Sequence, residues 1–328
     1  EMGTFAAILL GTIGGGLLIA PEGASPYLPF LVVALAVLCW LAAVFIPRTG
    51  AAAPNLAVDY NVVRSTFGLL ADLKSDPRLW TGGLITSWFW LVGAAALAIL
   101  PVLLNGEAGG DNTVITLGLA VFTIGIAIGS VFAARASHQR PNLALVPIGA
   151  ALMGLAALDL AWTASTLVKP TAGVGAWDFL ATWSGARLSA GLFLLALAGG
   201  LFIVPAFAAV QLWAAEDRKA RVVAACNVLS AAFMVAASLL LAALQVFGLG
   251  AATMFLILGI ANLIVVGLVL AAWGREGVKD VALFLFRVFL RLDVKGYENL
   301  PEPGTRALIA PNHVSFLDAP LMHAIMPG

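Results

Sequence analysis

Long runs of apolar residues follow one another along this chain, separated by connections that carry most of its charged residues. A bilayer core of about 30 Å needs about 20 apolar residues to cross it as a helix. A helix suits such a run because its backbone groups are satisfied within the segment. The qualifying segments are residues 4–20, 27–46, 79–104, 113–134, 142–164, 187–214, 221–247 and 251–273. This pattern predicts an all-α polytopic membrane protein with eight spans.

The composition agrees with a membrane protein. Hydrophobic residues make up 62% and charged residues 10% of the chain, whereas soluble domains carry about 25% charged residues. The 17 basic and 17 acidic residues cancel, so no overall basic field favours a nucleic-acid partner. Cys39 and Cys226 lie inside apolar runs and are interpreted as small core residues rather than as a disulfide or a metal site. The sequence starts with Glu1 rather than an initiator methionine, and no charged stretch precedes the first run. This start indicates no signal peptide and predicts further sequence upstream.

Charge alternates between successive connections. Of the 17 Lys and Arg residues, only Lys169 and Arg187 fall on the side that also holds Glu22, Glu107, Asp111 and Asp178. The positive-inside rule therefore places the basic connections and the tail after residue 274 in the cytoplasm. We expect a multi-pass protein of the bacterial inner membrane with both ends of this sequence inside.

The connection 47–78 divides the spans into two and six. It opens with the loop-like "PRTGAAAPN", while "YNVVRSTFGLLADLKSDPRLW" has apolar residues at helical spacing and ends in a Ser-Asp-Pro turn. These features favour an interfacial helix, with an ordinary solvated loop as the alternative. The predicted divisions are 1–46, 47–78, 79–274 and 275–328.

This layout resembles the major facilitator superfamily, whose transporters have twelve helices in two six-helix bundles. The resemblance identifies the visible spans as the fifth to the twelfth helix. It implies that "GTIGGG" (11–16) and "GIAIGS" (125–130) lie on two helices that face one another, where small residues permit close approach. The family's Gly-Arg pattern would be expected in the loop "AARASHQRPN" but is absent there. At that loop the sequence therefore departs from the family.

The seventh apolar segment carries a polar stripe. It consists of Asn227, Ser230, Met234, Ser238 and Gln245, spaced along one helical face. Polar side chains in a bilayer face a bundle interior or a cavity. The stripe therefore predicts either the lining of a transport cavity or hydrogen bonds between helices.

Asp159 is the one carboxylate plainly inside a predicted span, toward the outer side. An acidic residue within the membrane is a functional candidate. Two interpretations stay open: proton coupling, or a structural pairing with a donor such as Arg187.

The chain changes character after the last span. Residues 278–292 are apolar but interrupted by Arg287 and Arg291, so this run is predicted to lie along the inner surface of the membrane. "RLDVKGYENL" and "TRALIAPNH" then read as strands around the turn "PEPG", and "FLDAPLMHAIM" reads as the start of a helix. A soluble α/β domain is expected to begin here.

The segment "NHVSFLD" has the pattern Asn-His-x-Ser-x-x-Asp and, with its lead-in "VKGYENLP", resembles glycerolipid acyltransferases. The resemblance implies that His313 is the general base, that Asp318 orients it, and that Asn312 and Ser315 support the motif. It covers about fifty residues, and the later blocks of the family would lie beyond Gly328, so this sequence alone is expected to be inactive. A loop histidine beside a helix-capping acid is the alternative interpretation.

Acyl transfer to an alcohol requires a base that accepts the hydroxyl proton, and neutral imidazole suits this near pH 7. A carboxylate on the other ring nitrogen fixes the tautomer. No bound cofactor is expected; the acyl donor would be a thioester of acyl-carrier protein or coenzyme A.

Together the two parts resemble bacterial fusions of a lysophospholipid transporter with a lysophospholipid acyltransferase. The implied function is transport of lysophospholipid to the cytoplasmic leaflet followed by its re-acylation. The alternatives are a drug or metabolite exporter with an appended acyltransferase, and an acyltransferase that its helices merely anchor.

Overall fold

The computed structural model describes residues 7, 10, 11, 14, 15, 18–20, 23, 24, 26–47, 60–137, 140–168, 173–290, 310, 312 and 315–325. Its helices are α2 (Leu28–Val44), α3 (Val62–Lys74), α4 (Pro77–Pro101), α5 (Asn112–Ser137), α6 (Leu145–Ser165), α7 (Ala176–Ala181), α8 (Trp183–Trp213), α9 (Lys219–Val246), α10 (Ala251–Leu290) and α11 (Asp318–Ile325). A π-helical turn, η1 (Val102–Glu107), continues α4, and β1 (Ile19–Ala20) pairs antiparallel with β2 (Gly23–Ala24). Within these residues the fold is almost entirely helical, as the sequence predicted.

Among the residues that the structure describes, six helices are long and apolar enough to cross a membrane, which indicates a multi-pass membrane protein. They are Pro77–Glu107, Asn112–Ser137, Leu145–Ser165, Trp183–Trp213, Lys219–Val246 and Ala251–Arg275. These six confirm the last six predicted spans. The segment predicted at 27–46 forms the shorter helix α2, and most of the segment predicted at 4–20 lies outside the described residues.

Local signals in the sequence set several helix starts. Asp76 caps α4 by accepting the Arg78 and Leu79 N–H groups at 2.9 and 3.4 Å, and Pro77 follows at the first helical position. Thr182 caps α8 in the same way, through the N–H of Gly185 at 3.0 Å. The Ser-Asp-Pro turn before α4 therefore begins a span, as a capped helix start should.

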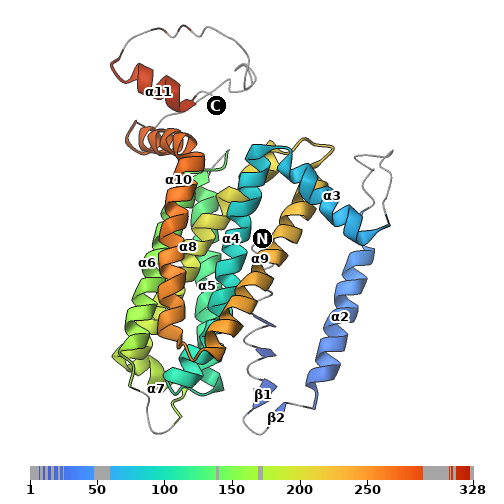
Figure 1. The fold of residues 1–328 in the computed structure, drawn as a ribbon, viewed down its shortest axis with the longest axis vertical. Helices are drawn as coiled ribbons and strands as arrows, with labels where there is room; N and C mark the ends of the chain where they lie inside the picture. Colours follow the sequence, from blue (N-terminus) through green and yellow to red (C-terminus); the bar gives the residue numbers. More distant parts are fainter. Residues whose placement is uncertain are drawn as a thin grey trace.

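The spans alternate in direction, so the basic connections share one end of the bundle, where α3, α11 and the last part of α10 also lie (Figure 1). We name this the basic end. It is the end at which α4, α6 and α9 begin, and it carries Lys74, Arg78, Arg135, Arg140, Arg218, Lys219 and Arg221. The opposite end carries Glu107, Asp111 and Asp178.

Glycines bring the helix backbones into contact. A Cβ placed on Gly129 of α5 would lie 2.0 Å from the carbonyl oxygen of Leu197 in α8, and one on Gly200 would lie 2.5 Å from the Ser130 nitrogen. A Cβ on Gly259 of α10 would lie 3.1 Å from the carbonyl oxygen of Gly154 in α6. Close approach of this kind is how helices associate where lipid removes the hydrophobic driving force.

The partner of the predicted glycine face is corrected by the structure. Gly125 and Gly129 meet α8, whereas a Cβ on Gly11, Gly14 or Gly15 would meet nothing within 4 Å. Among the described residues, the first glycine-rich segment therefore packs against no helix backbone. The α5 face is filled by a helix of its own bundle.

Beyond its span, α10 differs from the prediction. A separate surface helix was expected at 278–292, but α10 runs unbroken from Ala251 to Leu290. It bends at the basic end, so that its last part lies across the bundle (Figure 1). The helix predicted from "FLDAPLMHAIM" is present as α11 and packs against α10. Apart from Ala310 and Asn312, the two predicted strands lie outside the described residues.

The predicted helix in the connection 47–78 is present as α3, capped by Asn61. Its buried Leu73 joins a small apolar cluster at the basic end with residues of α4, α8 and α9. Asp72 fixes this position because its carboxylate pairs with Arg218 at 2.8 Å and with Arg221 at 3.4 Å. This connection is therefore helical over Val62–Lys74 and packs against the bundle.

Candidate functional site

A cavity of about 460 Å³ lies among α4, α5, α8 and α9, with Met153 of α6 at its wall. This volume falls within the range of small-molecule sites. Most of the wall is apolar, including Phe89, Trp90 and Phe122. Its hydroxyl and amide groups come from Thr86, Thr123, Asn227 and Ser230, and none of the described residues that line it carries a charge.

Three of the four polar residues that line the cavity, Thr86, Asn227 and Ser230, lie in the halves of α4 and α9 nearer the basic end. Thr86 and Asn227 lie within about three turns of the starts of α4 and α9, both at the basic end. Leu97 and Leu119 line the part nearer the opposite end. These three residues give the cavity a polar portion on its α4 and α9 walls, whereas Thr123 lies near the middle of α5 and apolar Phe207 of α8 also lies near the basic end.

The polar stripe predicted on α9 is split by the structure. Asn227, Ser230 and Met234 line the cavity, whereas Ser238 and Gln245 do not and lie further along the same helix. The Ser238 hydroxyl donates to the carbonyl of Met234 at 3.0 Å. The cavity therefore ends along α9 between Met234 and Ser238, and the transport role of all five residues stays a prediction.

Ser230 fits both interpretations of the stripe, cavity lining and hydrogen bonding between helices. Its hydroxyl oxygen lies 3.1 Å from that of Ser87 in α4, and the two share a hydrogen bond between helices. Both residues are buried. Ser230 consequently lines the cavity and also ties α9 to α4.

Sequence reasoning missed the polar residues that α4 and α5 bring to the cavity. Thr86 donates its hydroxyl hydrogen bond to Gly83 O at 3.0 Å, and Thr123 donates to Leu119 O at 2.8 Å. Each hydroxyl bonds within its own helix, a pattern that isolated Thr residues in apolar helices often adopt. The available signal was the polar pair Thr86 and Ser87 within "GGLITSWFW".

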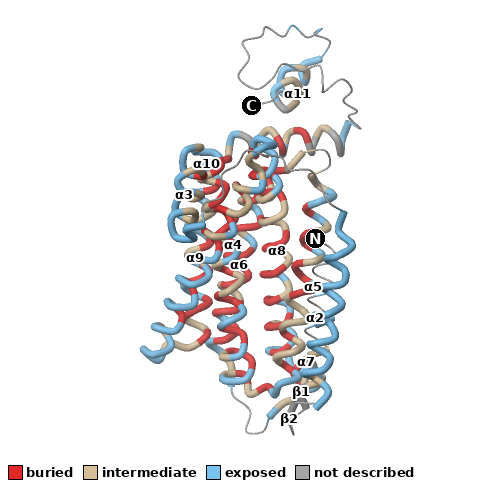
Figure 2. The backbone as a smooth tube through the Cα atoms, turned by 90° about the vertical axis from the view of Figure 1, so that its right-hand side faces the viewer, coloured by how far each residue is buried: buried red, intermediate tan, exposed pale blue. Residues whose placement is uncertain are grey.

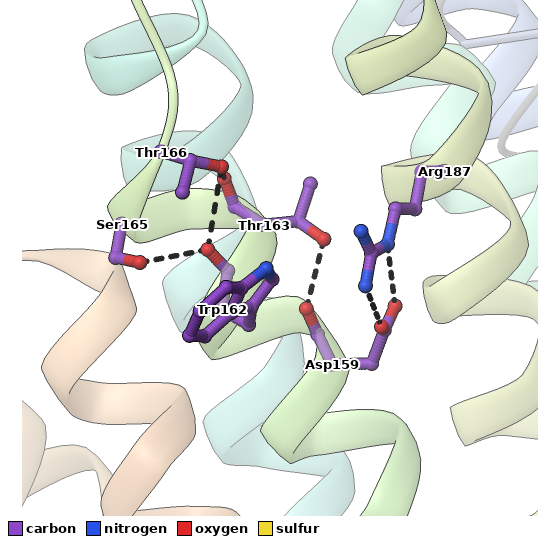
Figure 3. A network of polar contacts seen from close by, with 6 residues as sticks. All are labelled: Asp159, Trp162, Thr163, Ser165, Thr166 and Arg187. Carbon is purple, nitrogen blue, oxygen red and sulfur yellow. Dashed lines mark hydrogen bonds and ion pairs between the residues drawn. The ribbon is translucent and has the colours of Figure 1, made fainter.

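Asp159 is paired, as one of its two interpretations held. The Arg187 Nη2 group bonds Asp159 Oδ1, and Arg187 Nε donates to Oδ2 at 3.4 Å (Figure 3). Both side chains are partly exposed, and neither residue lines the cavity. Exposed Trp162, Trp177 and Trp183 lie near the same end, as aromatic residues do at a membrane interface. The structural pairing therefore accounts for Asp159, and proton coupling stays untested.

The described part of the Asn-His-x-Ser-x-x-Asp motif forms the start of α11. Asp318 Oδ2 accepts the backbone N–H of Ser315 at 2.7 Å, and Ser315 Oγ accepts the N–H of Leu317 at 3.2 Å. These two hydrogen bonds close the turn that precedes α11, so Asp318 accepts a backbone N–H at the start of that helix. Asn312 is exposed. The predicted base His313 lies outside the described residues.

Electrostatic ties also join the connections at the opposite end of the bundle. Asp111 Oδ1 accepts the hydroxyl of Thr113 at 2.5 Å and its N–H at 2.7 Å, and the hydroxyl hydrogen bond is the main cause that lowers the pKa of Asp111. The Thr113 hydroxyl in turn accepts the N–H of Ala176 at 3.0 Å. These bonds hold the start of α5 to the start of α7.

Searches of family models, curated proteins and solved structures found no match to this chain. Functional inference therefore rests on the cavity, the arrangement of the helices and the motif at α11.

Proposed function

We propose that this protein is a transporter of the major facilitator type that moves lysophospholipid to the cytoplasmic leaflet and continues into an acyltransferase that re-acylates it. The observation that carries the transport part is the cavity of about 460 Å³, in which three polar residues gather on the α4 and α9 walls and most of the remaining wall is apolar. A single-chain amphiphile has this same division into a polar head and an apolar tail.

The arrangement of the helices supports a transporter. The triplets α4–α5–α6 and α8–α9–α10 begin at opposite ends of the bundle, so the second triplet repeats the first with inverted direction. Their main contacts match in part under this exchange, because α4 packs on α9 as α5 packs on α8, and α6 packs on α10, whereas α6 packs far more extensively on α8 than α10 does on α4. Inverted repeats are a recurrent feature of secondary transporters.

The two triplets also share a proline. Pro101 and Pro205 lie inside the first helix of each triplet, each about two turns before its span ends. Paired interruptions in corresponding helices are a pointer to a transport site. Because the triplets are inverted, the two prolines fall near opposite ends of the bundle, on helices that both line the cavity.

The polar portion of the cavity suits the head of a lysophospholipid. Asn227 lies about two turns along α9 from Lys219 and Arg221. A phosphate near Asn227 would therefore be attracted by the positive charges of the basic end. Because none of the described lining residues is charged, the same cavity also fits an uncharged apolar solute. That observation favours the second candidate, an exporter of neutral compounds with an appended acyltransferase.

The two candidates are separated by transport assays on the full-length protein in vesicles. Lysophospholipid transport predicts uptake of labelled lysophosphatidylethanolamine above an empty-vesicle control. Met234→Trp should block it by filling the cavity, whereas Ser238→Trp, one turn further along α9 and outside the cavity, should not. Uptake equal to the control, with efflux of a neutral dye instead, would favour the exporter.

The orientation is part of the same proposal. The basic end would face the cytoplasm by the positive-inside rule. A reporter fused after Arg275 should be active only in the cytoplasm, and periplasmic activity of that fusion would contradict the access of the enzyme to cytoplasmic thioesters.

The acyltransferase part rests on the motif. His313 would take the proton of the lysophospholipid hydroxyl as its oxygen attacks the thioester carbonyl; the C–S bond breaks, and the departing thiolate recovers a proton. Asp318 would orient the imidazole and stabilise its cationic form. Acyl-carrier protein or coenzyme A would carry the thioester.

Three variants of the full-length enzyme test this assignment. His313→Ala should lower acylation by about two to four orders of magnitude, with uptake unchanged, while His323→Ala, exposed on α11 and outside the motif, should act as wild type. Asp318→Asn retains an oxygen that can accept the Ser315 N–H, so a severe loss of turnover would mark the missing charge rather than a lost hydrogen bond. Near-normal acylation by His313→Ala would identify the motif as a chance match.

A further inference from the structure

A buried carboxylate joins the end of α10 to a distant connection of the bundle. Asp280 is 8% exposed. Its Oδ1 lies 2.9 Å from Arg140 Nη2, and its Oδ2 accepts the N–H of Leu143 at 2.7 Å. A buried charge is tolerated when it is paired and hydrogen-bonded. Both of these partners belong to the connection between α5 and α6, so the carboxylate ties two parts of the protein that are far apart in sequence.

The connection between α5 and α6 is itself tied internally. Asn142, which is buried, donates to the carbonyl of Ala136 at 3.3 Å and accepts the N–H of Ala144 at 3.2 Å. Its own N–H reaches the Ser137 hydroxyl at 3.4 Å. These hydrogen bonds hold the end of α5 to the start of α6. We name residues 140–144, to which Asp280 binds, the α5–α6 corner.

One face of α10 beyond the bend packs on this corner. Gly277, Asp280 and Leu283 are buried and recur at helical spacing, while Val278 is exposed between them. A Cβ on Gly277 would lie 3.5 Å from the Cα of Ala144, which is ordinary contact. The Asp280 carboxylate also lies at the start of α6, where the helix dipole favours negative charge.

From these contacts we propose that Asp280 fastens α10 to the bundle as a positioning clasp, so that α11 and its acyltransferase motif stay at the basic end during transport. The support for α11 is α10 itself, since α10 runs helically from its span to Leu290 and α11 packs against it. Lysophospholipid that leaves the cavity would then be acylated before it mixes with the membrane pool. This inference rests on the proposed function for its activity readout.

The test compares two acylation rates of the full-length protein in vesicles. One uses lysophosphatidylethanolamine that the protein has transported, and the other uses the same lipid supplied directly on the side of the enzyme. Asp280→Ala should lower the first about tenfold, since tethering acts through effective concentration, and should leave uptake and the second rate unchanged. Asp217→Asn, an exposed aspartate at the same end, is the matched control.

Equal ratios of the two rates in wild type and in Asp280→Ala would overturn the clasp while leaving the proposed function intact. If wild type shows neither uptake nor acylation, the proposed function fails instead. Should Asp280→Ala not fold, Asp280→Asn serves in its place, because its amide oxygen can still accept the Leu143 N–H while the ion pair with Arg140 is lost.

A second measurement first uses disulfide formation, which needs no activity, and then compares uptake by the oxidised and reduced protein. In a background with Cys39→Ser and Cys226→Ala, the pair Ala144→Cys and Gly277→Cys should form a disulfide readily, and adding Asp280→Ala should slow its formation. Val278→Cys in place of Gly277→Cys is the control, since Val278 is 65% exposed. The oxidised pair should transport as well as the reduced one. Loss of uptake on oxidation, restored by reductant, would mean that α10 must leave the corner and would overturn the clasp.

Discussion

The six-helix bundle and the segment before it are both strongly apolar, yet their helices are packed very differently. Every described helix of the bundle presents buried residues to its neighbours, whereas α2 has none and is exposed at every residue after the half-buried Leu28 (Figure 2). The contrast shows that hydropathy predicts where a helix resides but not what it contacts. In lipid that second property depends on close packing and on polar ties between helices.

Glycine position distinguishes the two regions most sharply. Gly125 and Gly129 are spaced so that both face α8, and backbone atoms of that helix fill the space beside them. Gly14 and Gly15 belong to an equally glycine-rich stretch, but the space beside them is open. The same residue type therefore marks a tight interface in one region and no contact in the other.

The largest expected effect comes from filling that interface. Gly129→Leu should prevent the bundle from assembling, because even a Cβ there would lie 2.0 Å from the Leu197 carbonyl oxygen. A destabilisation above about 4 kcal/mol is expected. The measurement is the yield of monodisperse protein and its melting temperature in detergent. Gly15→Leu should be neutral, and wild-type stability of Gly129→Leu would contradict the packing of α5 on α8.

The two cysteines can be used to measure the difference in packing, because one lies in each of the two regions. Cys39 of α2 is exposed and Cys226 of α9 is buried. In detergent, a maleimide should label Cys39 at least about tenfold faster than Cys226, because the buried thiol reacts only after local opening. Mass spectrometry of timed samples measures both rates. Protection of Cys39 equal to that of Cys226 would show that α2 is packed in solution.

A smaller effect is expected from the hydrogen bond between Ser87 and Ser230. A double-mutant cycle of Ser87→Ala and Ser230→Ala should give a coupling of about 0.6 kcal/mol, typical of bonds between helices in membranes. Unfolding in mixed micelles provides the free energies. Ser238→Ala should change little, since its hydroxyl bonds the carbonyl of its own helix. Zero coupling would remove Ser230 as a tie between α9 and α4.

The smallest effect lies outside the spans, at Asp111. Its pKa is lowered in the folded protein, chiefly by the Thr113 hydroxyl, so its stabilising contribution is complete above its unfolded pKa of about 4 and is lost as the pH falls through the folded value. Melting temperatures measured from pH 6 down to about 3 should fall less steeply in Asp111→Asn. Thr113→Val should act likewise, and an unchanged slope in both variants would contradict this role.

Much of the fold could be predicted from residues that are close in sequence. The six spans followed from run length, and the start of α4 from Asp76 and Pro77. For the candidate site the sequence located the α9 residues but not their limits, because Ser230 and Ser238 look alike in a one-dimensional pattern. Only the positions of α4 and α5 decide that the cavity includes Ser230 and stops before Ser238.

The sequence by itself determined the last six spans, that the basic connections share one end, and that a helix begins within "FLDAPLMHAIM". Each of these depends on composition or on neighbours a few residues away. The tertiary structure alone decided that α5 packs on α8, that Asp159 pairs with Arg187, and that Asp280 is buried against the corner before α6. These contacts join helices remote in sequence, and their formation depends on the register and the facing of whole helices, which no local pattern records.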